Sequence, residues 1–211
     1  MAAEPGEQNG QLAGDLAVDT AWNLVHYRST DGTAWALYWN GSQWTQATLG
    51  SSANVAGHLS VDSVWHNVYY RGTDGQMWVY YVGGGHWLQT QLSATANIGS
   101  AVTADTGGLI YYASSADNSA WAEYWTGRAW SQTSLGVTPI LTNSTFLYSH
   151  AVPIAIDSAG RCQVIYVSGN VWTSAILETG GSNLAGGLSA IPSAGLIFAI
   201  RTDSSLAVFV P

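Results

Sequence analysis

The sequence predicts an all-β fold, a five-bladed β-propeller of four-stranded antiparallel blades, and three observations predict it. First, tryptophans return at a step of 43 residues, as Trp44, Trp87 and Trp130 show. Second, each interval holds short segments that alternate apolar and polar residues, as strands do. Third, Asp-Gly, Asn-Gly and Thr-Gly pairs separate these segments, and glycine favours tight hairpins because it adopts positive φ at little cost. A four-strand unit of about 43 residues is typical of propeller blades.

The first three copies of the repeat carry this pattern most clearly. In the first copy, GDLAVD, NLVHYRST, TAWALYW and SQWTQATL follow one another, with DG and NG at the second and third turns. GHLSVD opens the second copy and SAVTAD opens the third, each followed by three similar segments. We therefore expect four strands in each of these copies.

The fourth and fifth copies keep the spacing but lose most of the tryptophans. VPIAIDSAG, RCQVIYVS and NVWTSAIL match the second, third and fourth strands of copy four, and LIFAIRTDSS and LAVFV match the second and third strands of copy five. Copy five ends there, so its outer strand comes from residues 1–12, comes from a partner chain, or does not exist. Second strands are expected to start near 23, 67, 109, 152 and 196.

A single propeller domain over residues 1–211 is therefore expected. Its N-terminal segment, 1–11, is either flexible or closes the ring. The blades are expected at about 12–52, 53–95, 96–137, 138–180 and 181–211.

Composition excludes several partners. Of the 211 residues 47% are hydrophobic and only 9% are charged, and the net charge is -8. The five basic residues are dispersed arginines, so neither nucleic acid nor an anionic membrane surface is expected as a partner. No apolar run is long enough for a membrane helix. Cys162, the single cysteine, excludes an intramolecular disulfide and is expected in the core.

The N-terminal sequence MAAEPGEQNG has neither a basic region nor an apolar run. It does not have the form of a secretory signal, so we expect a cytoplasmic protein. Secretion is the alternative if a signal precedes the given sequence.

Tryptophans flank the third turn of the repeat and are the candidate ligand-binding residues. WNGSQW and WTGRAW each place two indoles five residues apart, whereas VGGGHW keeps only the second. Flat aromatic faces at a hairpin tip suit the apolar face of a sugar ring or another flat ligand. The alternative is that they fill the wedge between blades. These residues are Trp39, Trp44, Trp87, Trp125 and Trp130.

The blade pattern resembles that of the fucose-binding propeller lectins of fungi and soil bacteria. The resemblance implies a propeller fold and a sugar site made by an arginine on the second strand, a glutamate on the third and the tryptophans around the third turn. It is carried by AVDTAW, LVHYRSTDG and ALYWNGSQWTQATLG in copy one, by SVDSVW, NVYYRGTDG and GHWLQTQLS in copy two, and by EYWTGRAWSQTSLG in copy three.

The polar clamp that this resemblance implies is replaced here. Three interpretations follow. Sugars bind elsewhere, for instance through backbone groups, or the apolar slots beside the tryptophans are part of the packed core between blades. The third is that one site is remade for a hydrophobic small molecule. By alignment the arginine positions are Val25, Val68 and Ile110, and the glutamate positions are Ala36, Val79 and Ala122.

Three ionisable residues break the repeat and are the candidate catalytic residues if the protein is an enzyme. An enzyme needs a single acid and base, whereas a lectin repeats its site. Polar residues on exposed strand faces are the alternative explanation. The three are His26, Glu123 and Asp157, whose counterparts in other copies are Tyr69, Leu37 and Arg28, respectively.

Neither a metal site nor a cofactor is expected. The histidines share no metal-ligand spacing, and no nucleotide-binding motif is present. Asp19, Asp62 and Asp105 end the first strand of three copies, where they either cap turns or form a carboxylate ring for a cation.

Two functions from different classes follow from the sequence. The first is a lectin-like, non-catalytic protein that engages a carbohydrate by aromatic stacking at several blades, where avidity replaces affinity. The alternative is a cofactor-free, cyclase-like enzyme, or a binding protein for an apolar small molecule in one channel or inter-blade pocket. The expected partner is thus a glycan or a small molecule, and homo-oligomerisation is left open.

Overall fold

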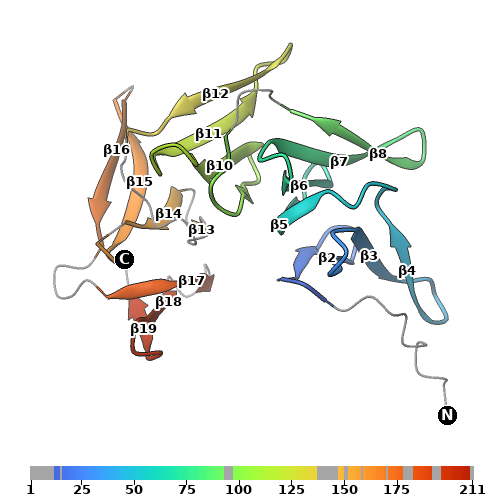
Figure 1. The fold of residues 1–211 in the computed structure, drawn as a ribbon, viewed down its shortest axis with the longest axis horizontal. Helices are drawn as coiled ribbons and strands as arrows, with labels where there is room; N and C mark the ends of the chain where they lie inside the picture. Colours follow the sequence, from blue (N-terminus) through green and yellow to red (C-terminus); the bar gives the residue numbers. More distant parts are fainter. Residues whose placement is uncertain are drawn as a thin grey trace. The chain divides into compact units, whose positions relative to one another are not determined.

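The strands of the chain are joined by short turns in a computed structural model (Figure 1). Within the described residues the chain forms strands and turns, and none of them belongs to a helix that could cross a membrane. The structure describes residues 12–14, 16–92, 97–136, 147–149, 152–157, 159–169, 171–177, 183–191 and 196–209.

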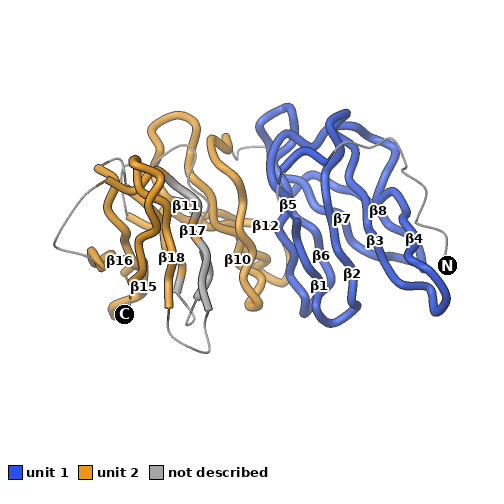
Figure 2. Tube along the Cα trace, turned by 90° about the horizontal axis from the view of Figure 1, so that it is seen from below, with its two compact units in different colours: residues 1–96 blue, residues 97–211 orange. Residues whose placement is uncertain are grey.

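Five antiparallel sheets follow one another along the chain, and in each the spatial order of the strands is their sequence order. The first four sheets have four strands and the fifth has three among the described residues. The predicted fold class, an all-β five-bladed propeller, is confirmed. The chain divides into two compact units, residues 1–96 and 97–211 (Figure 2).

The first unit contains the first two sheets, which are meanders of four strands. Their hairpins form where the sequence places Asp-Gly, Asn-Gly and Gly-Gly pairs. The first sheet consists of β1 (Ala17–Asp19), β2 (Leu24–Arg28), β3 (Ala34–Trp39) and β4 (Trp44–Thr48), and the second of β5 (Val55–Asp62), β6 (Asn67–Gly72), β7 (Met77–Gly83) and β8 (His86–Gln91).

The second unit contains the other three sheets. The third consists of β9 (Thr103–Ala104), β10 (Leu109–Ala113), β11 (Ala120–Trp125) and β12 (Trp130–Ser134). The fourth consists of β13 (Leu147–Ser149), β14 (Val152–Ile156), β15 (Cys162–Ser168) and β16 (Val171–Ile176). The fifth consists of β17 (Leu184–Ile191), β18 (Leu196–Arg201) and β19 (Leu206–Phe209).

Within the first unit, one face of the first sheet packs against one face of the second. Ala34 and Ala36 of β3 share a buried hydrophobic cluster with Val68, Tyr70 and Tyr80 of the second sheet. Small residues on one side and large ones on the other let the two sheets approach closely. Strand alternation thus gives the first sheet one face that packs against the second sheet.

The same arrangement joins the sheets of the second unit. Ala155 of β14 lies in a cluster with the third sheet, whereas its neighbours Ile154 and Ile156 lie in a cluster with the fifth. The fourth sheet is therefore buried on both faces. Cys162 is buried in the second of these clusters, as the sequence predicts.

The start of the described chain extends the first sheet. Leu12 forms an isolated bridge with Ser29, and the backbone N–H of Ala13 donates to the carbonyl oxygen of Arg28 at 2.9 Å. The expected contribution of residues 1–12 to the fifth sheet falls largely on residues 1–11, which lie outside the described residues.

Candidate functional site

Two pairs of tryptophans stand at the hairpin tips that the sequence singles out. Trp39 lies directly across from Trp44, and Trp125 from Trp130. The ring centroids of the first pair are 5.9 Å apart and edge-on at 71°, and those of the second are 5.7 Å apart and tilted by 58°. Trp39, Trp44 and Trp125 are about half exposed (54%, 48% and 52%), and Trp130 is partly buried. Each tip therefore presents aromatic surface to solvent.

The turn between Trp39 and Trp44 is held rigidly by its own side chains. The Asn40 side-chain oxygen Oδ1 accepts the backbone N–H groups of Ser42 and Gln43, each at 3.0 Å. Gly41 takes a φ of +99°, which only glycine adopts at little cost. The indoles are thus presented by a preorganised hairpin rather than by a mobile loop.

The corresponding turn of the third sheet is closed by a hydroxyl. The Thr126 side chain accepts the Ala129 N–H at 3.1 Å and donates to the Ala129 carbonyl oxygen at 2.8 Å. The two tips therefore reach the same indole arrangement through different side chains.

Trp87 occupies the position of Trp44 in the second sheet but has a different environment. It lies across from Val82 and packs against the hydrophobic cluster between the first two sheets. Its ring contacts that of His26 edge-on, with centroids 5.7 Å apart. Of the five candidate tryptophans, this one lies in the wedge between sheets.

A tyrosine–glutamine hydrogen bond recurs behind the tips. Tyr27 donates to Gln46 Oε1 at 2.6 Å, and Tyr112 donates to Gln132 Oε1 at 2.8 Å. The second sheet pairs Tyr70 with Gln89 at the equivalent place in the reverse direction: the Gln89 amide donates to the Tyr70 hydroxyl, which donates to Asn54 Oδ1 at 3.2 Å. Burial raises the pKa of Tyr112 well above its ordinary value, and the nearby Glu123 adds to this effect. These hydroxyls remain protonated donors.

The positions of the expected polar clamp do not face each other. In the first sheet Val25 pairs with Leu37, and Ala36 pairs with His26, so Val25 and Ala36 lie on opposite faces. The same register recurs in the second and third sheets. The residue that pairs with Ala36 is His26.

Five of the six apolar residues at these positions are part of the core, and Val25 is partly buried. Ala36 and Val68 are buried in one cluster, Ala122 is buried in another, and Ile110 is fully buried. Among the three readings of the missing clamp, this environment corresponds to blade packing.

His26 is fully buried, and neither ring nitrogen has a hydrogen-bond partner among the described residues. Burial lowers the pKa of His26 to about 4, although the negative charge of Asp19 opposes this shift. At the equivalent position of the third sheet, Tyr111 donates to Asp105 at 2.8 Å. The imidazole is therefore neutral at ordinary pH.

Glu123 lies in the second unit, fully buried, and neither carboxyl oxygen has a hydrogen-bond partner among the described residues. Burial raises the pKa of Glu123 to about 7. It sits on β11 across from Ile110 and Gln132. His26 belongs to the first unit, so each unit holds one of these two buried groups.

Asp157 is engaged in a structural network. Its Oδ2 accepts from Arg161 Nε at 2.8 Å and from Gln163 Nε2 at 2.7 Å, and its Oδ1 accepts two backbone N–H groups. Burial alone would raise the pKa of Asp157, but the hydrogen bonds and charge of Arg161 and the hydrogen bond from Gln163 lower it. Both oxygens of this carboxylate are therefore occupied by hydrogen bonds.

The register of Asp157 differs from the alignment. Gly160 N–H donates to the Asp157 carbonyl oxygen at 2.9 Å, as Gly32 N–H donates to that of Ser29 at 3.0 Å. Asp157 therefore corresponds to Ser29, not to Arg28, because it opens the second turn of its blade.

The aspartates that end the first strands cap the following turns. Asp19 Oδ1 accepts the N–H groups of Ala21 and Trp22 at 3.0 and 3.2 Å, and Asp62 caps its own turn in the same way. No group of three or more metal-ligating side chains occurs in the described part of the chain. Turn capping is thus the role that the geometry supports.

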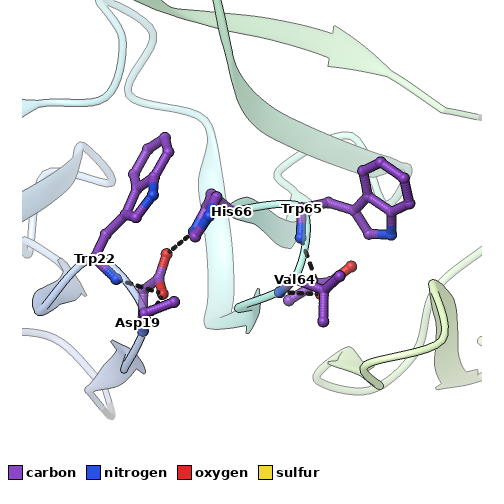
Figure 3. Close-up of polar contacts among 7 residues, drawn as sticks. Asp19, Trp22, Val64, Trp65 and His66 are labelled. Carbon is purple, nitrogen blue, oxygen red and sulfur yellow. Dashed lines mark hydrogen bonds and ion pairs between the residues drawn. The ribbon is translucent and has the colours of Figure 1, made fainter.

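A second aromatic group at these turns is not singled out by the sequence. Trp22 stacks on His66 with ring centroids 3.7 Å apart, and His66 Nδ1 lies 2.7 Å from Asp19 Oδ2 (Figure 3). Trp65 is 67% exposed and points away from this cluster (Figure 3). The sequence does carry a sign of this aromatic group, because a tryptophan follows each of Asp19 and Asp62 by three residues.

Comparisons with known proteins agree on the fold alone. No family model matches the sequence, and no curated protein matches it. The structure is similar to that of AofleA from Arthrobotrys oligospora, with a TM-score of 0.61 and 13% identity over 94% of this chain and 68% of AofleA. A triple arginine-to-alanine mutant of AofleA gives a TM-score of 0.62 and 14% identity over 96% and 69% of the two chains. These similarities place the chain among folds of this architecture.

Proposed function

We propose that this protein is a lectin-like, non-catalytic carbohydrate-binding module. It engages glycans by stacking on the tryptophan pairs at the tips of the first and third sheets. The observation that carries the proposal is that two separate sheets each hold a pair of partly exposed indoles on a rigid turn. Exposed tryptophan is costly in water, and the C–H face of a pyranose is a suitable covering surface.

Several features support a binding role over a catalytic one. Both carboxylate oxygens of Asp157 are occupied by hydrogen bonds, and His26 and Glu123 are fully buried. Neither buried residue has a hydrogen-bonded partner in the described part of the chain that would make an acid–base pair. Repeated weak sites also suit multivalent capture, in which avidity replaces affinity.

The chain offers its own matched substitutions for a test. Val82 and Val167 naturally replace the first tryptophan of the pair in the second and fourth sheets. Trp39→Val and Trp125→Val therefore convert a paired tip into an existing unpaired one, and the fold should tolerate them.

Binding should be measured on a dense glycan array. We expect each single variant to lose at least about tenfold in surface binding, and the double variant to lose all of it, because avidity requires two sites. Trp65→Ala is the control: it removes the exposed indole of the turn between β5 and β6 and should bind as the wild type does. A double variant with wild-type binding would overturn the proposal, as would a blank array with folded protein.

A further inference from the structure

The two tryptophan pairs of the proposed function differ in what lies beside them on the sheet. In the first sheet the residue two positions before Trp39 is Leu37; in the third sheet the residue two positions before Trp125 is Glu123. Side chains two apart on a strand share a face and lie about 7 Å from each other. The third sheet therefore places a carboxyl group next to its aromatic pair.

The carboxyl oxygens of Glu123 accept no hydrogen bond from the described residues. Ile110 on one side contributes none. Tyr112, which lies on the same face, donates its hydroxyl hydrogen to Gln132. A buried carboxyl group lacking hydrogen bonds is unfavourable, which makes the arrangement a ready acceptor for an incoming donor.

We propose that the third-sheet tip is a site for a glycan carrying a protonated amino group, such as a glucosamine unit, with Glu123 as the residue that recognises the ammonium. This inference rests on the proposed function and specifies the ligand of one of its sites. The sugar ring stacks on the Trp125–Trp130 pair, and its ammonium lies against the Glu123 carboxylate.

The chemistry favours an ammonium over a hydroxyl group. An ammonium brings three N–H donors and a positive charge, whereas a hydroxyl brings one donor. Charge-assisted hydrogen bonds are roughly twice as strong as neutral ones, and the indole faces attract a cation as well. A metal ion fits poorly, because the described residues hold no cluster of three metal-ligating side chains.

Access to Glu123 requires movement of the side chains that cover it, because the carboxyl group is fully buried, whereas Trp125 at the tip is half exposed. The ligand first stacks on the exposed indole surface and then reaches the carboxyl group when this cover opens. The first-sheet tip, with Leu37 in place of the acid, takes neutral sugars only.

The test compares glucosamine oligosaccharides with their fully N-acetylated counterparts, which have the same backbone but no charge. Calorimetry at about pH 7 keeps much of the amine protonated and lets the Glu123 carboxyl group, whose pKa burial raises to about 7, ionise. The wild type should prefer the amino form by about tenfold or more, as charge-assisted hydrogen bonds predict. Glu123→Leu, which copies the first sheet, should remove this preference.

Two further variants keep the test decisive. Glu123→Gln preserves the side-chain shape and should also remove the preference, and Leu37→Glu should create a second amine-selective site in the first sheet. Equal binding of both oligosaccharides by the wild type, or an unchanged preference in both Glu123 variants, would overturn the inference. Neutral glycans bound on the array without any amino-sugar binding would overturn it and leave the proposed function intact. No glycan binding of any kind would reject both.

Discussion

Asp19 of the first sheet and His66 of the second are joined by a 2.7 Å contact between Oδ2 and Nδ1. Asp19 is almost fully buried, and its other carboxyl oxygen caps the turn that carries Trp22. Trp22 in turn stacks on the His66 ring. One aspartate thereby orders its own turn and links it to the neighbouring sheet.

Substitution of His66 by asparagine should destabilise this link. Asparagine tolerates the left-handed backbone, as Asn23 shows at the equivalent position with a φ of +55° against +59° for His66. The variant loses the contact to Asp19 and the stacking on Trp22, so we expect the free energy of unfolding to fall by about 1–3 kcal/mol. Urea denaturation measures it, and an additive double variant with Asp19→Asn would show that the two residues are not coupled.

Acid should destabilise the protein through His26. Burial lowers the pKa of His26 to about 4 from an ordinary 6.5. As pH falls below 6.5 the unfolded chain takes up a proton that the folded chain refuses, so stability is lost between pH 6.5 and about 4. The loss is on the order of 3 kcal/mol.

His26→Tyr is the matched variant, because Tyr69 and Tyr111 occupy this position in the next two sheets. Its unfolding free energy should vary less with pH over that window than the wild type's. An identical pH slope in the two proteins would show that His26 titrates normally.

A rise in pH from acid to neutral should destabilise the protein through Glu123, which is the reverse of the pH dependence expected for His26. Burial raises the pKa of Glu123 from 4.5 to about 7. The folded chain holds a proton that the unfolded chain has released, so the stabilisation is complete below pH 4.5 and is lost as pH rises through about 7. The loss is again on the order of 3 kcal/mol.

Glu123→Leu should remove this pH dependence and raise the unfolding free energy above pH 7, since Leu37 fills the same position in the first sheet. Thermal unfolding across the pH range measures both effects. A variant that is less stable than the wild type at alkaline pH would show that the carboxylate has a partner.

Asp157→Asn should affect stability and not function. The carboxylate binds Arg161 at 2.8 and 2.7 Å and Gln163 at 2.7 Å, so the change should cost about 2 kcal/mol of unfolding free energy. Glycan binding by the folded fraction should stay within about twofold of wild type. A variant of normal stability that binds nothing would assign Asp157 to the functional site.

The strand pattern was predictable in detail because it depends on local sequence. The second strands expected near 23, 67, 109, 152 and 196 begin at Leu24, Asn67, Leu109, Val152 and Leu196. The glycine turns and alternating residues set these boundaries without long-range information. Even the weak fifth copy ends after its third strand within the described residues, as its length predicts.

The candidate site was predictable only in part. Trp44 and Trp87 occupy the same repeat position after the third turn, yet Trp44 is half exposed and Trp87 packs between sheets. The sequence offers no means to distinguish them, because exposure depends on which face of a neighbouring sheet lies opposite. The partner of Ala36 across the strand pair likewise came from the structure: the register pairs it with His26 and puts Val25 on the opposite face.

The sequence by itself determined the repeat, the strands, the turns and the tryptophan pairs, all of which arise from neighbours within a few residues. Only the tertiary structure decided which of these groups are buried and what they contact. It placed His66 against Asp19 across two sheets, engaged Asp157 with Arg161 and Gln163, and left Glu123 buried without a hydrogen-bond partner in the described residues. Burial and pairing join residues from different strands and sheets, and they set the charge state on which any function of these groups depends.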